Sequence, residues 1–194
     1  WRPERWIDMF GYPGLWGVFG LAVGLYMMYR WAQKHKQDVF EVWDFFSVQL
    51  AWYFAWYWVS RFFFGAAAGR PTNLPWGIIF PQRVEPAHPV QLYAAVVFFA
   101  LFAYLWWAEP RYRFFLWYRS KKRTAKTGFL FSVFLIVSGL LGFFLSFVQY
   151  PFWLIFDIDS NQILNILIFF VGCVLLYMRS GRTFFLSSQK KKGT

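Results

Sequence analysis

The chain has 194 residues, of which 59% are hydrophobic and 26% aromatic, and its formal net charge is +11. Several apolar runs reach the length of about 20 residues that a membrane-spanning helix needs, which excludes an ordinary soluble globular domain. The single cysteine, Cys173, excludes an intramolecular disulfide and a cysteine-rich metal site.

Five apolar stretches predict membrane-spanning helices. They lie at about residues 15–29, 43–64, 90–107, 128–148 and 162–178. Between the second and third spans, residues 65–87 are rich in glycine and proline, which predicts an irregular outer loop. The expected fold is an all-α integral membrane protein, a five-span helical bundle in a single domain over residues 1–194.

The distribution of charge predicts how these spans are oriented. Most of the 20 Lys and Arg residues lie on one side of the expected bundle, including the basic loop 109–127 and the basic tail 179–194. The positive-inside rule places that side in the cytoplasm, so the N-terminus is expected outside and the C-terminus inside. The basic segments are expected to lie against anionic lipid head groups rather than nucleic acid, because topology alone explains them.

The N-terminus gives no sign of a signal peptide. The chain begins at Trp1 rather than methionine, and charged residues stand at Arg2, Glu4, Arg5 and Asp8. We expect a processed or N-terminally shortened chain.

Aromatic residues in the second span exceed what belts at the two membrane interfaces need. Trp52, Tyr53, Trp56, Tyr57 and Trp58 fall within seven positions. This density predicts a surface that packs against lipid, pigment or another membrane protein, and the sequence does not distinguish among them.

Polar residues cluster just before the third span. Proline is accepted in the first turn of a helix, so His88-Pro89 predicts a helix start at the membrane surface. Gln91 follows three residues later and would share a helical face with His88. Such residues are either functional or ordinary interfacial anchors.

Arginines on the same outer side suggest an anion site. Arg61, late in the second span, either extends to the lipid surface or holds a phosphate with two donors. Together with Arg70, Arg83 and His88 it would suit the head group of an anionic phospholipid.

Several motifs resemble one known family. His88-Pro89-Val90-Gln91-Leu92-Tyr93 resembles the H-P-x-Q-L-Y-E motif of the prolipoprotein diacylglyceryl transferases, and Phe40 to Phe45 resembles their F-x-V-x-D-F segment. Ser60-Arg61 falls at the Gly-Arg of their G-R-x-G-N signature, and Gln162-Ile163-Leu164 resembles the start of their last span.

This resemblance implies a seven-span bundle in the bacterial inner membrane, of which these five spans would be the later ones. It also implies transfer of a diacylglyceryl group from phosphatidylglycerol to the cysteine thiol of a lipoprotein signal peptide. Neither a metal nor a cofactor is expected, apart from a bound phospholipid. The residues expected at the head group are Arg61, Arg70, Arg83, His88, Gln91 and Tyr93.

The sequence departs from the family at positions that carry its chemistry. The family histidine of H-G-G-L appears as Tyr12, and a phenol is a poor base near neutral pH. An arginine and a glutamate four residues later appear as Gly142 and Ser146, and the acid that closes H-P-x-Q-L-Y-E appears as Ala94.

Three interpretations follow. The first is a relative that has lost catalysis and serves as a lipid-contacting structural or accessory subunit of a membrane assembly. The second is an active transferase whose catalytic residues lie at shifted positions, with Arg61, His88 and Tyr12 as the catalytic candidates. The third is an unrelated transporter, channel or cofactor-binding subunit. A haem shared by His35 and His88 is disfavoured, since they are expected on opposite sides of the membrane.

Overall fold

The computed structural model describes residues 13–66, 68–81, 83–119, 125–151, 154–155 and 158–180. The chain forms two compact units, residues 1–43 and 44–194. The first unit holds α2 (Pro13–Lys34) and the first residues of α3 (Val39–Phe63). Both segments fall where the sequence predicts the first two spans.

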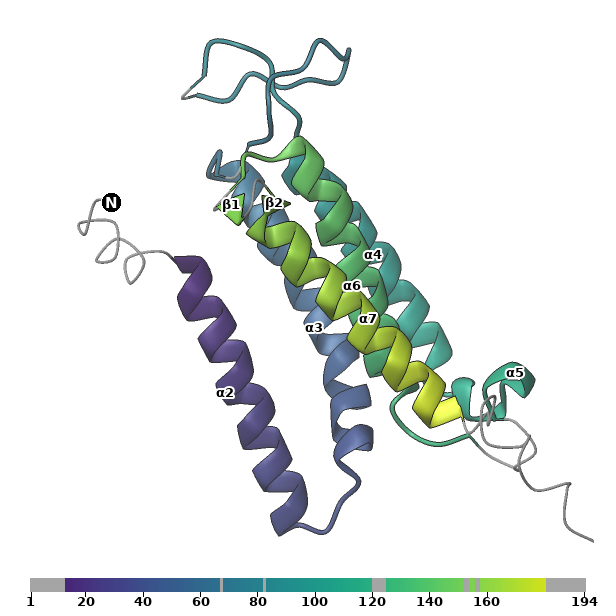
Figure 1. The fold of residues 1–194 in the computed structure, drawn as a ribbon. Coiled ribbons are helices and arrows are strands. Elements are labelled where there is room, and N and C mark those ends of the chain that lie inside the picture. The colour runs from purple at the N-terminus through teal and green to yellow at the C-terminus, as the bar shows by residue number, and fades with distance from the viewer. Residues whose placement is uncertain are drawn as a thin grey trace, which may run out of the picture. The chain divides into compact units, whose positions relative to one another are not determined.

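The second unit holds the rest of α3 and three further long helices (Figure 1). These are α4 (Val90–Ala108), α6 (Phe129–Val148) and α7 (Ser160–Ser180). A short 3-10 helix, η1 (Tyr112–Phe114), and α5 (Leu116–Arg119) follow α4, and the antiparallel strands β1 (Leu154–Ile155) and β2 (Ile158–Asp159) precede α7. The prediction of an all-α membrane protein is confirmed.

Three of the described helices are both long enough and apolar enough to cross a membrane, namely α4, α6 and α7. The other two, α2 and α3, have 22 and 25 residues, which is sufficient length. In α3, the charged residues Glu41, Asp44 and Arg61 and the many Trp and Tyr side chains lower the mean hydropathy. A span at α3 is therefore better supported by its packing in the bundle than by its hydropathy.

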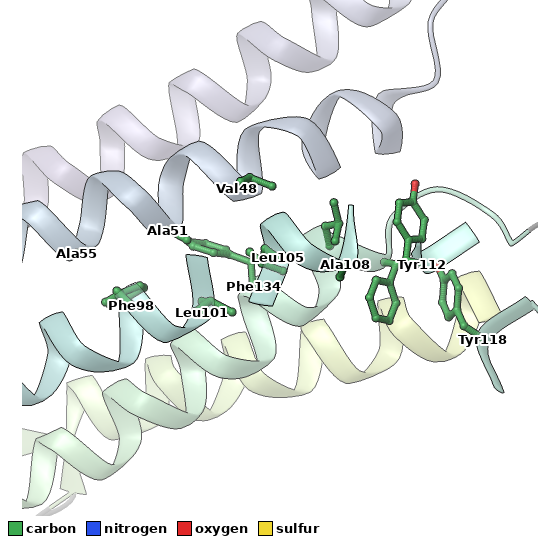
Figure 2. Packing of buried hydrophobic residues seen from close by; sticks show 12 residues of the cluster. Val48, Ala51, Ala55, Phe98, Leu101, Leu105, Ala108, Tyr112, Tyr118 and Phe134 are labelled. Atoms are coloured by element: carbon green, nitrogen blue, oxygen red, sulfur yellow. The ribbon is translucent and has the colours of Figure 1, made fainter. Parts of the chain in front are cut away.

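The core of the second unit lies where α3, α4 and α6 meet (Figure 2). Ala51 and Ala55 of α3 are fully buried, and their small side chains let the larger rings of the neighbouring helices approach. Phe98 of α4 and Phe134 of α6 both stack on the ring of Phe54. Small residues on one helix and aromatic residues on its neighbours therefore fill the centre.

Helices α6 and α7 approach each other closely at glycines. A Cβ atom added at Gly139 would lie 2.6 Å from the backbone nitrogen of Phe169 and 2.7 Å from the carbonyl oxygen of Asn165. A Cβ atom added at Gly172 would lie 2.9 Å from the backbone nitrogen of Ile136. Such close approach gains van der Waals contact in lipid, where the hydrophobic effect does not drive helices together.

The carboxylate of Asp44 joins α3 to the start of α6. Its Oδ2 accepts the N–H of Gly128 at 2.7 Å, and its Oδ1 accepts the N–H of Phe131 at 2.9 Å. Gly128 has a φ of 103°, a left-handed conformation that glycine adopts without strain. Asp44 is only 3% exposed, so these bonds satisfy N–H groups that water does not reach.

Two tyrosines lie beside this carboxylate on the connection between α4 and α6. Burial, and next the charge of Asp44, raise the pKa of Tyr112 to about 12, and its hydroxyl hydrogen-bonds the carboxylate. Burial and the same charge also raise the pKa of Tyr118. Both rings pack on Phe129, so the connection is held against the first turn of α6.

We expect Gly139→Ala to destabilise the bundle by about 1–3 kcal/mol, because the new methyl group meets backbone atoms that do not move aside. Gly142→Ala is the matched control in the same helix, since its methyl group meets the side-chain amide of Asn165, which rotates more easily. The measurement is unfolding by SDS in mixed micelles, followed by circular dichroism. Equal losses for the two variants would contradict the backbone contact.

We expect Asp44→Ala to lower the free energy of unfolding by about 2–3 kcal/mol, because it leaves two buried N–H groups without their charged acceptor. The control is Glu109→Ala, which removes an exposed carboxylate next to the end of α4. The same SDS titration measures both variants. If Asp44→Ala lowers the free energy of unfolding no more than the control does, the hydrogen bonds from Asp44 to the start of α6 contribute little to stability.

Candidate functional site

The outer loop between α3 and α4 is irregular, as predicted, and is held by backbone hydrogen bonds. The N–H of Gly69 donates to the carbonyl of His88 at 2.9 Å, and the N–H of His88 donates to that of Arg70 at 3.1 Å. Ile78 and Ala87 exchange two further bonds of 3.1 and 3.0 Å. In the part of this loop that the structure describes, the chain forms isolated bridges and no helix.

Glycine is required where this loop leaves α3. A Cβ atom added at Gly69 would lie 2.7 Å from both the Cβ of His88 and the carbonyl oxygen of Val148. The loop backbone is therefore inserted between the start of α4 and the end of α6. This close approach brings the outer ends of α3, α4 and α6 together.

Arg61 lies in the last turn of α3 and is half-buried. Its Nη1 donates to the hydroxyl of Tyr57 at 3.4 Å, and its guanidinium carbon lies 5.7 Å from the centre of the Tyr57 ring. The Nε atom is buried and has no acceptor among the described residues. A buried cationic donor without an acceptor marks a place where an anion would be stabilised.

Gln91, in the first turn of α4, is fully buried. Its Nε2 donates to the carbonyl of Ala66 at 2.6 Å, and the N–H of Ala66 donates to the carbonyl of Arg61 at 3.0 Å. The amide oxygen of Gln91 is buried and accepts no hydrogen bond from the described residues. Gln91 therefore ties α4 to the turn that follows Arg61, and it keeps one acceptor available.

His88 and Tyr93 form a second polar group. The Nδ1 of His88 lies 3.4 Å from the hydroxyl of Tyr93, and that hydroxyl accepts the indole N–H of Trp76 at 2.8 Å. Because an indole N–H only donates, the Tyr93 oxygen is the acceptor of this bond. Toward His88, the Tyr93 hydroxyl either donates to an unprotonated Nδ1 or accepts from Nδ1–H, according to the tautomer of the imidazole. His88 and Gln91 have different partners, although their spacing predicts a shared face.

Arg70 and Arg83 contact backbone carbonyls. The Nε of Arg70 donates to the carbonyl of Gln149 at 2.9 Å. The Nη1 of Arg83 donates to the carbonyl of Gly69 at 2.8 Å, and its guanidinium lies 5.1 Å from the centre of the Tyr150 ring. These two side chains fasten the loop to the end of α6, so a role at a head group for either one stays a prediction.

The structure thus places the sequence-predicted residues in two groups at the end of the bundle where the loop between α3 and α4 lies. Arg61 and Gln91 are linked through Ala66, while His88 and Tyr93 are linked directly. Tyr12 lies outside the described residues. No cluster of three or more potential metal ligands occurs among the described side chains.

Sequence reasoning missed Tyr57 and Trp76 as partners of these residues. Tyr57 stands four positions before Arg61 on one helix, and that spacing could have revealed it. Trp76 lies in the loop at no informative spacing from Tyr93, so only the folded chain reveals this contact.

Comparison with known proteins identifies the family. The family model for prolipoprotein diacylglyceryl transferase matches residues 13–178. The chain belongs to the prolipoprotein diacylglyceryl transferase family. The H-P-x-Q-L-Y resemblance therefore reflects a relationship that extends over most of the chain.

Three curated relatives, each named phosphatidylglycerol–prolipoprotein diacylglyceryl transferase, show the extent of this similarity. The Bordetella parapertussis protein is 33% identical over 138 residues, which cover 70% of this chain and 47% of the relative. The Aeromonas hydrophila protein is 29% identical over 168 residues, which cover 82% of this chain and 56% of the relative. The Cupriavidus pinatubonensis protein is 40% identical over 93 residues, which cover 46% of this chain and 33% of the relative. The chain spans about half the length of these relatives.

Three of the positions that the resemblance marks as departures, Ala94, Gly142 and Ser146, are neutral and lie in close contacts. Ala94 is fully buried and packs beside Leu145. The hydroxyl of Ser146 donates to the carbonyl of Phe143 in its own helix at 2.6 Å. Beside Gly142 lies the side-chain amide of Asn165, whose Nδ2 donates to the carbonyl of Asn161 at 2.7 Å.

We expect Trp76→Phe to loosen the outer loop, because it keeps a ring and removes the donor to Tyr93. Loss of a hydrogen bond worth about 1 kcal/mol makes amide hydrogen exchange roughly five-fold faster at residues whose exchange requires local opening of the loop. Hydrogen–deuterium exchange of residues 69–88 measures the effect, with Trp106→Phe at the C-terminal end of α4 as the control. Unchanged exchange in the loop would contradict this role for Trp76.

Proposed function

We propose that this chain is a diacylglyceryl-transferase-like membrane protein that binds an anionic phospholipid head group at Arg61 and does not itself carry out the transfer. In this proposal it acts as a lipid-contacting structural or accessory subunit of a membrane assembly. The relatives are named for phosphatidylglycerol, so phosphatidylglycerol is the lipid that we propose.

The proposal that this chain binds a lipid head group rests on the geometry of Arg61. Because Nη1 contacts Tyr57, the opposite edge of the guanidinium, formed by Nε and Nη2, has no acceptor within the described residues. Two parallel N–H donors on that edge match two oxygens of a phosphate. The buried Nε would make this bond in a site of low dielectric, where a charged hydrogen bond is strong.

The loss of catalysis is proposed from the residues that replace the family's charged ones. Transfer to a thiol requires a group that takes the thiol proton and groups that stabilise the departing phosphate. Arg61 can stabilise phosphate, but Ala94, Gly142 and Ser146 have no side chain that takes a proton near neutral pH. Their close packing supports a structural role for this part of the bundle.

Location and orientation belong to the same proposal. We infer a multi-pass protein of the bacterial inner membrane with its N-terminus outside and its C-terminus in the cytoplasm, since the basic segments then lie on the cytoplasmic side. Arg61 and the loop at residues 65–87 would then face the outer leaflet. The head group bound there would be one of the outer leaflet.

One observation favours a second candidate function, an active transferase whose catalytic residues lie at shifted positions. In the tautomer whose Nδ1–H donates to the Tyr93 oxygen, which also accepts the indole N–H of Trp76, the Nε2 of neutral His88 is unprotonated. Neutral histidine is a suitable general base near pH 7, so His88 could accept a thiol proton while Arg61 stabilises phosphate.

We expect Arg61→Gln to weaken phosphatidylglycerol binding by about ten-fold or more, because a charged two-donor contact to phosphate is lost. Native mass spectrometry of the detergent-purified chain, titrated with phosphatidylglycerol and with phosphatidylcholine, measures the lipid adducts. Arg111→Gln removes the same charge from the inner end of α4, where Nη1 donates to the carbonyl of Trp107. Equal effects of the two substitutions would contradict a specific site at Arg61.

Complementation separates the two functions. We expect the chain to fail to rescue growth of cells depleted of their diacylglyceryl transferase, although it reaches the membrane. Rescue that is lost in His88→Ala would favour the active transferase and overturn the loss of catalysis. Binding of phosphatidylglycerol without rescue is the result that supports the proposal in full.

A further inference from the structure

The side-chain oxygen of Gln91 is a buried acceptor that the fold itself does not explain. Gln91 is fully buried, and its Oε1 accepts no hydrogen bond from the described residues. The neighbouring residues of α4, Val90 and Ala94, are also fully buried and cluster with Leu145 of α6. In such apolar surroundings an unpaired acceptor costs free energy, so this oxygen requires a donor that the described residues do not supply.

The orientation of the Gln91 amide is fixed by its other half. Nε2 donates to the carbonyl of Ala66 at 2.6 Å. A carbonyl oxygen only accepts, so a flipped amide would place two acceptors against each other. Gln91 therefore turns its oxygen away from Ala66 and presents an acceptor, not a donor, to a ligand.

This acceptor is tied to the turn that follows Arg61. The N–H of Ala66 donates to the backbone carbonyl of Arg61 at 3.0 Å, and the carbonyl of Ala66 accepts from Gln91. Two hydrogen bonds and the length of one residue keep the Gln91 amide within about 10 Å of the Arg61 backbone. The buried Nε of Arg61 also has no acceptor among the described residues, so a ligand that satisfies both groups carries an acceptor and a donor.

A phosphate group by itself satisfies only one of these two residues. A phosphodiester near neutral pH has acceptor oxygens and no donor, so it pairs with Arg61 and not with the oxygen of Gln91. An ammonium group would donate to Gln91, but the nearby guanidinium repels a second cation. A hydroxyl group donates and stays neutral. The two residues therefore match a phosphodiester whose head group carries a hydroxyl.

We propose that Oε1 of Gln91 accepts a hydrogen bond from a glycerol hydroxyl of phosphatidylglycerol whose phosphate lies against Arg61. This inference rests on the head-group site proposed at Arg61 and assigns recognition of the glycerol to Gln91. Gln91 is then the residue that distinguishes phosphatidylglycerol from lipids with the same phosphodiester and no hydroxyl on the head group.

Competition between two lipids tests this assignment. Phosphatidylglycerol and phosphatidylpropanol share the phosphodiester and the three head-group carbons, but only phosphatidylglycerol has head-group hydroxyls. Native mass spectrometry of the detergent-purified full chain measures both adducts together when acyl chains of different mass label the two lipids. We expect phosphatidylglycerol to bind about five-fold more tightly or better, as one additional buried hydrogen bond provides. Equal binding of the two lipids by the unaltered chain overturns the proposal without any variant.

The variant Gln91→Met tests whether this side chain is the source of the preference. Methionine has a similar length and neither donates nor accepts as an amide does, so both lipids should bind this variant equally. Damage to the turn after Arg61 would weaken both lipids alike and leave their ratio unchanged. The matched control is Gln162→Met, at a half-buried glutamine in the first turn of α7, which should keep the preference. A preference that survives in Gln91→Met overturns the proposal.

Soluble glycerol phosphate tests whether the occupant is a lipid, because it carries the phosphate and the hydroxyls without acyl chains. We expect phosphatidylglycerol to stay bound when glycerol phosphate is in excess, since the acyl chains contribute apolar contact that the soluble compound lacks. Displacement of the lipid by glycerol phosphate would overturn a lipid as the occupant of this site.

Arg61→Gln separates failure of this inference from failure of the proposed function. If the unaltered chain binds the two lipids equally and Arg61→Gln weakens both, the head-group site stands and the role of Gln91 is wrong. If Arg61→Gln weakens neither lipid, the head-group site itself is wrong.

Discussion

The carboxylate of Asp44 is the contact on which the arrangement of the second unit depends. The first N–H groups of a helix have no partner within that helix, and in a membrane protein water does not reach those that are buried. Asp44 supplies acceptors to two of them from a position 84 residues away from Gly128. This bond fixes the register of α3 against α6, so the small residues Ala51 and Ala55 face the neighbouring rings. Arg61, about 25 Å further along α3, then falls at the end of the bundle where the loop between α3 and α4 lies.

At that end of the bundle, backbone groups of the described loop residues form many hydrogen bonds, while selected side-chain atoms have no partner. The loop exchanges hydrogen bonds with the start of α4 and the end of α6, and Arg70 and Arg83 add side-chain bonds to backbone carbonyls. By contrast, the Nε of Arg61 and the amide oxygen of Gln91 are buried without partners among the described residues. These two unpaired groups are the basis of the proposed head-group site, since a buried polar group without a partner in a native structure calls for an explanation.

The contact between α6 and α7 is built from small and neutral residues. Gly139 and Gly172 bring the two backbones into contact, and Asn165 occupies the space beside Gly142. Placing neutral residues in close contact within a membrane costs less free energy than placing an arginine and a carboxylate there. The same packing that stabilises this pair of helices leaves no room for a larger side chain at Gly139, whereas a methyl group at Gly142 requires only that the Asn165 amide rotate.

The sequence by itself determined the helical class, the positions of the long helices and the family, because apolar runs of spanning length and the H-P-x-Q-L-Y motif are local features. It also placed Arg61, His88, Gln91 and Tyr93 at one end of the bundle. Only the tertiary structure decided that Asp44 caps α6, that Gln91 binds the carbonyl of Ala66, and that Trp76 donates to Tyr93. Each of these contacts depends on how a helix is rotated about its axis. A membrane helix is apolar on nearly all sides, so its sequence periodicity does not reveal which face turns inward.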